Sequence, residues 1–145
     1  MNSKLNVFTI VNSLYRSNTY ILSASSDVDN GVWIVDLGDT DRLADCLAEN
    51  MVLRGILLTH THYDHIYGIN DALRLFPDIR IITTEFGKQA LCSPKLNYSR
   101  YHLNVEILYV INPKISKCFT MVMSFILLMS KRFMYTRFQV TTKVV

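Results

Sequence analysis

The pattern of apolar and polar positions near the N-terminus predicts two short strands. Residues 5–11 alternate in the manner of a half-buried strand, and residues 19–22 resemble a second strand after the turn-prone residues 16–18. Asn30-Gly31 is a typical hairpin tip, so we expect residues 27–31 to form a hairpin loop. The run 31–36 that follows is almost continuously apolar, which predicts a strand buried on both faces.

A strand-helix-strand unit is expected next. Thr40 is suited to cap a helix whose first turn carries Asp41. Helical spacing places four apolar residues on one face of that helix, namely Leu43, Ala44, Leu47 and Ala48. Residues 55–59 are a short apolar strand, so residues 31–59 form a βαβ unit, whose two strands are parallel in nearly every known case.

The rest of the N-terminal pattern continues this alternation of loops, helices and strands. The expected elements are a polar loop over 60–67, a helix over 70–76, a strand over 79–83, a helix over 84–91, a loop over 93–100 and a strand over 105–110. The fold class predicted is therefore α/β, with a mixed β-sheet and flanking helices.

Composition divides the chain near residue 105. The 145 residues suit a single domain, and their 50% hydrophobic content excludes a disordered chain. Residues 1–105 carry 9 Lys and Arg against 11 Asp and Glu, and all five glycines, whereas residues 106–145 carry 6 basic residues and only Glu106. We therefore interpret 1–105 as one unit and 106–145 as an atypical apolar and basic tail, from a truncated or frame-shifted gene.

The tail contains an apolar run, residues 118–130, flanked by basic residues. This run is shorter than the roughly 20 residues that a transmembrane helix needs, so no transmembrane segment is predicted. A buried helix or strand pair is the default interpretation, and an interfacial helix is the alternative.

Cysteine usage points to a reducing compartment. Cys46, Cys92 and Cys118 are widely spaced and form no CxxC pair, which disfavours a structural zinc knuckle. With no secretory signal visible, we expect free, mostly buried thiols and a cytoplasmic protein.

Chemistry is concentrated in the loop after the strand 55–59. His60, His62, Asp64 and His65 lie within six positions, and imidazole and carboxylate are the usual ligands of catalytic zinc. Residues two apart in an extended loop point to the same side, so His60 and His62 can share one metal while Asp64 and His65 face a second. The carboxyl end of a parallel strand is also where open α/β sheets place ligands. The alternative is a solvated loop that happens to be rich in histidine.

The pattern His60-x-His62-x-Asp64-His65 resembles the metallo-β-lactamase superfamily. Residues 18–22 look like its early strand, and Val35-Asp36-Leu37-Gly38 looks like its "V-D-x-G" turn. Gly68 looks like the glycine after the histidine loop, and Asn97 with Ser99 resembles an "N-x-S" shared by hydroxyacylglutathione hydrolases. The resemblance covers about residues 5–105.

Membership would imply part of an αβ/βα sandwich and a zinc-dependent hydrolase that attacks an ester, thioester or amide. It implies up to two zinc ions, with His60 and His62 on the first, Asp64 and His65 on the second, and Asp64 also hydrogen-bonding the attacking water as the catalytic carboxylate. Iron or manganese are the alternative metals. Asp36 would lie behind the ligands and orient their loop, unless it belongs to a plain helix-entry turn.

The sequence departs from that pattern after the histidine loop. The family expects a third histidine for the first metal and a bridging aspartate, yet only His102 follows His65 and no aspartate follows Asp78. We interpret His102 as a loop or core histidine. An inactive fragment with weak metal binding or an interaction role is the competing hypothesis, and a sulfur dioxygenase on the same fold stays open.

The expected partner is a small-molecule substrate, and nucleic acid is disfavoured because the basic residues of the tail form no dense patch. Half a sandwich would leave one face of its sheet uncovered, which a second copy of the chain or the apolar tail could occupy.

Overall fold

A computed structural model describes residues 5–24, 27–47, 50–111, 113–117 and 142–144 of the chain. The described strands are β1 (Leu5–Val11), β2 (Asn18–Ala24), β3 (Gly31–Val35), β4 (Val52–Leu57), β5 (Ile81–Thr83), β6 (Ile115–Lys117) and β7 (Thr142–Val144). The described helices are α1 (Asp41–Cys46), α2 (Ile69–Leu75) and α3 (Glu85–Leu91), with short 3-10 turns η1 (Tyr63–His65) and η2 (Ser99–Tyr101).

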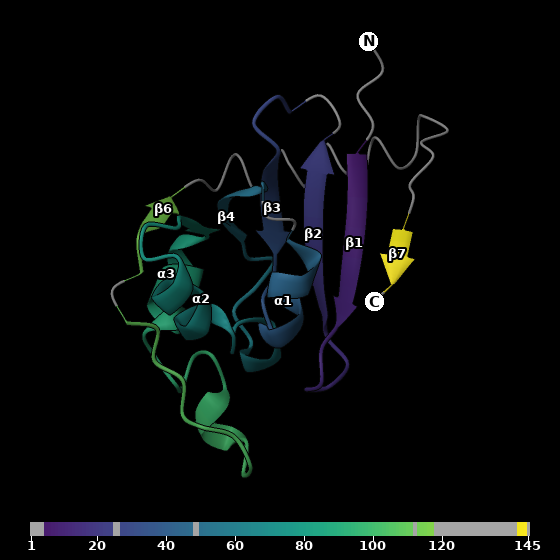
Figure 1. Cartoon of the computed structure of the whole chain (residues 1–145). Coiled ribbons are helices and arrows are strands. Elements are labelled where there is room, and N and C mark those ends of the chain that lie inside the picture. The colour runs from purple at the N-terminus through teal and green to yellow at the C-terminus, as the bar shows by residue number, and fades with distance from the viewer. Residues whose placement is uncertain (1–4, 25–26, 48–49, 112, 118–141, 145) are drawn as a thin grey trace, which may run out of the picture.

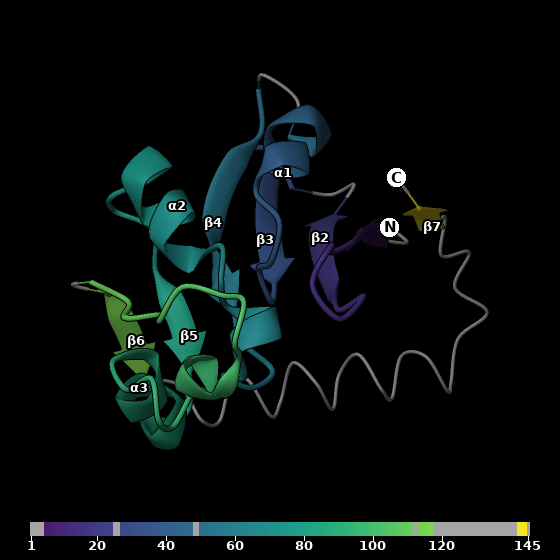
Figure 2. The same ribbon diagram turned by 90° about the horizontal axis from the view of Figure 1, so that it is seen from below.

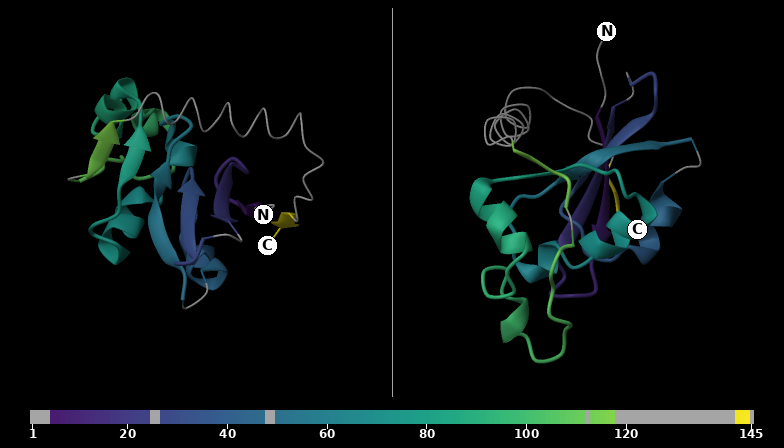
Figure 3. Two further views of the ribbon diagram at one scale, coloured as in Figure 1. Left: turned by 90° about the horizontal axis from the view of Figure 1, so that it is seen from above. Right: turned by 90° about the vertical axis from the view of Figure 1, so that its left-hand side faces the viewer.

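The strands form one mixed sheet in the order β6-β5-β4-β3-β2-β1-β7, which confirms the predicted fold class. β1, β2 and β3 pair antiparallel, while β3, β4, β5 and β6 pair parallel. β7 pairs parallel with β1 at one end of the sheet, and β6 lies at the other (Figure 3). The parallel β3-α1-β4 unit expected from the sequence is therefore present.

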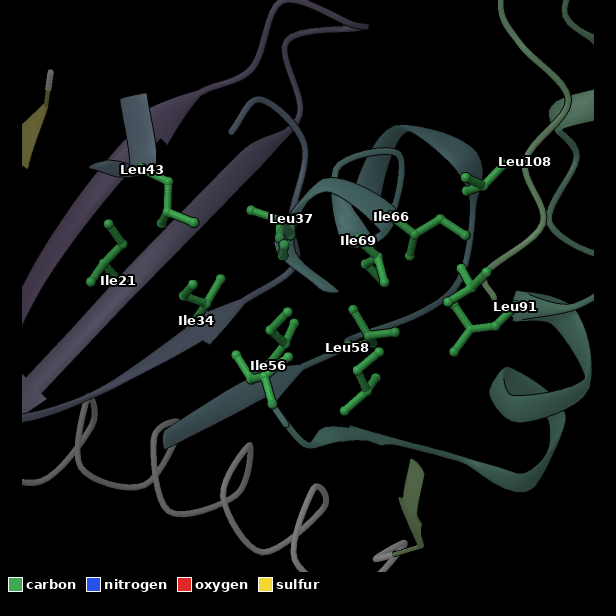
Figure 4. Packing of buried hydrophobic residues seen from close by; sticks show 14 of the residues in the cluster. Ile21, Ile34, Leu37, Leu43, Ile56, Leu58, Ile66, Ile69, Leu91 and Leu108 are labelled. Atoms are coloured by element: carbon green, nitrogen blue, oxygen red, sulfur yellow. The ribbon is translucent and has the colours of Figure 1, made fainter. Parts of the chain in front are cut away.

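The main core lies between the sheet and its helices. Branched aliphatic side chains of the strands, such as Ile34 and Ile56, meet Leu43 of α1, Ile69 of α2 and Leu91 of α3 in one buried cluster. Figure 2 shows α1 and α2 beside the central strands, and Figure 4 shows the cluster running from Ile21 to Leu108. The opposite face of the sheet carries a smaller cluster, made by Leu57, Ile82, Trp33 and Val35.

Two local predictions are wrong. Thr40 has helical backbone angles and its hydroxyl donates to Asp71 Oδ2 at 3.4 Å, so its side chain does not cap α1. Residues 105–110 are not a strand in this structure. The segment is extended, but its backbone does not pair with any of the described strands. Instead, Leu108 N donates to Ser99 Oγ and Val110 N donates to Leu91 O, both at 3.0 Å. These two bonds hold Leu108 and Val110 in the core while Tyr109 between them is exposed.

Leu108 and Val110 are buried in the same core as the elements before them. The division of the chain at residue 105 stays a prediction. The apolar run 118–130 lies outside the described residues, as do Ala48 and Cys118. Among the residues that the structure describes, no helix has the length and apolarity needed to cross a lipid bilayer.

Candidate metal centre

The histidine loop begins at the carboxyl end of β4, next to the turn that follows β3. Asp36 is the first residue of that turn and has a left-handed backbone, with φ of 53°. Its amide donates to Leu57 O at 2.9 Å, and the next amide, of Leu37, donates to His65 O at 2.8 Å. The parallel pairing of β3 and β4 therefore brings Asp36 and the histidine loop together at one sheet edge.

The Asp36 side chain is 2% exposed and accepts three hydrogen bonds. Thr59 N donates to Oδ1 at 2.8 Å, Thr59 Oγ1 donates to Oδ2 at 2.6 Å, and His65 Nδ1 lies 2.8 Å from Oδ2. A buried carboxylate is stabilised by donors of this kind, because they replace the water that it has lost. Asp36 thereby fixes both the start and the end of the histidine loop.

These contacts determine which nitrogens of two histidines are free. Asp36 accepts the Nδ1 proton of His65, so His65 Nε2 keeps its lone pair. Thr59 Oγ1 has one proton, which it donates to Asp36, so the 3.0 Å contact with His60 Nδ1 requires the imidazole to be the donor. Both rings therefore present an unprotonated Nε2, the form that binds a metal.

The structure brings Asp36, His60 and His65 together, with ligand atoms that all lie within 4.8 Å of one another. A tetrahedral zinc with nitrogen and oxygen ligands needs its ligand atoms about 3.3 Å apart, which is closer than the 4.8 Å limit within which these atoms lie. The donor set, imidazole and carboxylate, suits zinc and also iron or manganese. Because both oxygens of Asp36 already accept hydrogen bonds, its geometry suits a group that orients the ligands behind the metal.

His62 and Asp64 lie beside this set. The His62 ring is in edge contact with the His60 ring, with centroids 4.7 Å apart, and the His65 and His60 centroids are 4.1 Å apart. Asp64 Oδ2 lies 3.4 Å from His65 Nε2. The three imidazoles of the loop and its carboxylate are thus neighbours, although His62 and Asp64 do not belong to the tightest group.

The pKa of His60 lies below its ordinary value. Desolvation is the main cause, and the neighbouring His65 imidazole adds to it. Lowering of this kind favours the neutral imidazole, which is the metal-binding form, at neutral pH.

At the end of the histidine loop, the backbone of Gly68 passes close to the turn that follows β3. Gly68 N donates to Leu37 O at 3.2 Å, and a Cβ at position 68 would collide with the carbonyl oxygen of Gly38. Position 68 therefore needs glycine, as the sequence indicated. This approach places the start of α2 directly against the turn that holds Asp36.

A buried polar network supports the loop from the β1-β2 connection. Ser17 Oγ donates to Asp64 O at 2.6 Å and accepts from Asn12 Nδ2 at 3.1 Å. Asn12 also bonds Thr19 Oγ1, which in turn accepts from Gly38 N at 3.0 Å. The hydrogen bonds of this network join the histidine loop to the turn after β3 without involving Asp36.

Sequence analysis assigned no role to Thr59, although it precedes the first histidine and holds Asp36 through two hydrogen bonds. Its place at the end of the predicted strand, directly before the first histidine, was the available signal. His102 lies in the loop after η2, where its Nδ1 is 2.7 Å from Tyr15 Oη. It is not part of the group of His60, His65 and Asp36.

Sequence comparison finds relatives of known activity over part of the chain. The hydroxyacylglutathione hydrolase of Hahella chejuensis is 45% identical over 62 residues, covering 42% of this chain and 24% of that protein. The same enzyme of Hydrogenovibrio crunogenus is 34% identical over 76 residues, or 52% of this chain and 28% of that protein. An atrochrysone carboxyl ACP thioesterase of Cryptosporiopsis sp. is 40% identical over 70 residues, or 46% of this chain and 21% of that protein. The matches thus span about a quarter of the relatives' length.

Structure comparison agrees with the sequence matches. The crystal structure of the B3 metallo-β-lactamase BLEG-1 superposes with a TM-score of 0.61 and 27% identity, covering 77% of this chain and 50% of that chain. No family model matches the sequence.

Proposed function

The metallo-β-lactamase superfamily accounts for part of this chain, and on that premise we propose that the protein is a metal-dependent hydrolase of small acyl thioesters or esters. The observation that carries the proposal is the convergence of His60, His65 and Asp36 at the carboxyl end of β4. The names of the relatives, a hydroxyacylglutathione hydrolase and a thioesterase, favour an acyl group on a thiol carrier as the substrate.

In this proposal, His60 and His62 would hold a first zinc ion, and Asp64 and His65 would hold a second. Asp36 lies behind these ligands and holds the tautomer of His65 that leaves Nε2 free. A bound zinc ion would supply Lewis acidity toward water and toward the substrate carbonyl. Asp64, whose carboxylate is only partly buried, would accept a proton from the water molecule that attacks the substrate.

A second candidate function is metal binding without turnover. The matched segments cover about a quarter of the relatives' length, and His102, the one histidine after the loop, is hydrogen-bonded to Tyr15. Catalytic zinc sites usually have three protein ligands and an open position, so a set limited to the loop would bind metal more weakly.

A cytoplasmic location stays part of the proposal and rests on the cysteine usage.

Zinc content and thioester hydrolysis of the purified full chain test the proposal together. We expect bound zinc, and release of free thiol from hydroxyacylglutathione that stops when a chelator is added. His60→Ala and His65→Ala should abolish both signals, whereas His102→Ala, a matched change at a histidine outside the cluster, should preserve both. Zinc without thiol release would favour the second candidate. Zinc-free protein, or variants of His60 and His65 that bind zinc like the parent chain, would overturn both.

A further inference from the structure

Tyr98 lies at the centre of the "N-x-S" segment and faces the histidine loop. Its side chain is 50% exposed, whereas Asn97 and Ser99 on either side are fully buried. Its backbone has φ of 67° and ψ of 0°, a left-handed conformation that few residues other than glycine adopt. The sequence therefore places a large aromatic residue at a position whose backbone conformation is unfavourable for it.

Hydrogen bonds of the two flanking residues impose that conformation. Asn97 Nδ2 donates to Leu108 O at 3.0 Å, and Leu108 N donates to Ser99 Oγ at 3.0 Å. Asn97 Oδ1 also accepts from Ser99 N at 2.9 Å. Because both neighbours of Tyr98 are tied to the same buried residue, the loop has little freedom to relax, and the Tyr98 ring is presented outward from a fixed base.

The Tyr98 ring contacts the His62 ring, and its centroid also lies 6.1 Å from that of the Tyr101 ring. The Tyr98 and His62 centroids lie 4.9 Å apart at an interplanar angle of 81°, an edge-to-face arrangement. His62 has the His60 ring on another side, at 4.7 Å and 78°. The exposed His62 imidazole is thus held between two aromatic rings.

His62 differs from the other two histidines of the loop in the hydrogen bonding of its ring nitrogens. His60 Nδ1 is bonded to Thr59, and His65 Nδ1 is bonded to Asp36. Within the described part of the chain, no hydrogen bond is found at either ring nitrogen of His62. Metal-binding histidines ordinarily have such a partner, which fixes the orientation of the ring.

We propose that Tyr98 is the positioning residue for His62, and that its edge-to-face contact takes the place of the missing hydrogen-bond partner. The inference rests on the proposed function, because it assumes that His62 is a metal ligand. This role accounts for an aromatic residue with an unfavourable backbone conformation at position 98. The hydrogen bonds of Asn97 and Ser99 hold the backbone of Tyr98 rigid, and a rigid backbone is what the Tyr98 ring needs to orient His62.

Zinc affinity of the full chain, measured by competition with a chromophoric chelator, tests the inference through a double-mutant cycle. Tyr98→Asn removes the ring but tolerates the left-handed backbone, and should weaken zinc binding about two- to tenfold. Tyr98→Phe retains the ring and should bind zinc as the parent chain does. In a His62→Ala background, Tyr98→Asn should have no further effect, because its action passes through His62. Tyr109→Asn, the same change at a tyrosine that is 57% exposed, is the control.

The His62 ring protons in nuclear magnetic resonance spectra of the metal-free chain give a second measurement that does not depend on zinc. Tyr98→Asn should shift these signals and Tyr98→Phe should largely preserve them, and the amide spectrum shows whether each variant is folded. A parent chain that binds no zinc overturns the proposed function and this inference with it. A zinc-binding parent chain whose affinity is unchanged by Tyr98→Asn, or changed equally in the presence and absence of His62, overturns the inference alone.

Discussion

Replacing Asp36 with asparagine should change the tautomer of His65. Thr59 N can only donate, so the amide oxygen of the new residue must stay where Oδ1 accepts that bond now, at 2.8 Å. The amide nitrogen then takes the place of Oδ2 and points protons at Thr59 Oγ1 and at His65 Nδ1. The hydroxyl can accept such a proton, but His65 can accept only if its own proton moves from Nδ1 to Nε2.

The cost to folding should be moderate. Asp36 accepts three hydrogen bonds, and each loses about 1 kcal/mol of charge assistance in the asparagine variant, while the cost of burying a charge disappears. We expect a net loss of about 1–3 kcal/mol in the free energy of unfolding. Asparagine tolerates the left-handed backbone at this position, whereas Asp36→Ala would remove the acceptor of all three hydrogen bonds and should cost more than the asparagine change does.

The cost to metal binding should be large, because the protonated Nε2 of His65 no longer offers a lone pair. Loss of a partner that orients a metal-binding histidine typically weakens affinity about 10- to 100-fold. Urea unfolding of the metal-free chain and chelator competition for zinc measure the two effects separately. Asp41→Asn, the same change at an exposed aspartate in the first turn of α1, should leave zinc binding unchanged and lower the free energy of unfolding by only about 0.3–1 kcal/mol. A folded Asp36→Asn chain that binds zinc as tightly as the parent would contradict the tautomer argument.

Three further outcomes follow from the structure. Gly68→Ala should lower the free energy of unfolding by about 1–3 kcal/mol in urea, because its methyl group would enter the facing turn; an unchanged midpoint would contradict the close approach. Thr84→Ala should cost about 1 kcal/mol in the same assay, because Thr84 Oγ1 caps α3 by accepting from Gly87 N at 3.0 Å, and Thr84→Ser should recover most of the loss. Burial would raise the pKa of Asp39, but hydrogen bonds from Tyr67 and Ser13 outweigh it and hold that pKa below its ordinary value. Stability from Asp39 should therefore be full above about pH 4 and lost as the pH falls through the lowered pKa, so an Asp39→Asn chain with the same acid unfolding profile as the parent would rule out this contribution.

The local pattern of the sequence was sufficient to predict the parallel β3-α1-β4 unit, the need for glycine at position 68, and the position of the histidine loop at the end of β4. Each of these depends on short-range information. Apolar periodicity defines a strand, a histidine cluster after a strand lies at its carboxyl end, and a βαβ unit has one common handedness. The candidate chemistry was visible for the same reason, since three imidazoles within six positions are neighbours in any extended loop.

Short-range patterns could not predict which residues far apart in the chain contact one another. The apolar alternation of residues 105–110 has the same period in a strand and in an extended segment packed on side chains, and only the positions of Ser99 and Leu91 distinguish them. The same holds at the metal centre. Thr59 and Asp36 select the free nitrogens of His60 and His65, and Tyr98 meets His62 across 36 positions of sequence, through contacts that exist only once the β3 and β4 ends and the loop after α3 meet at one edge of the sheet.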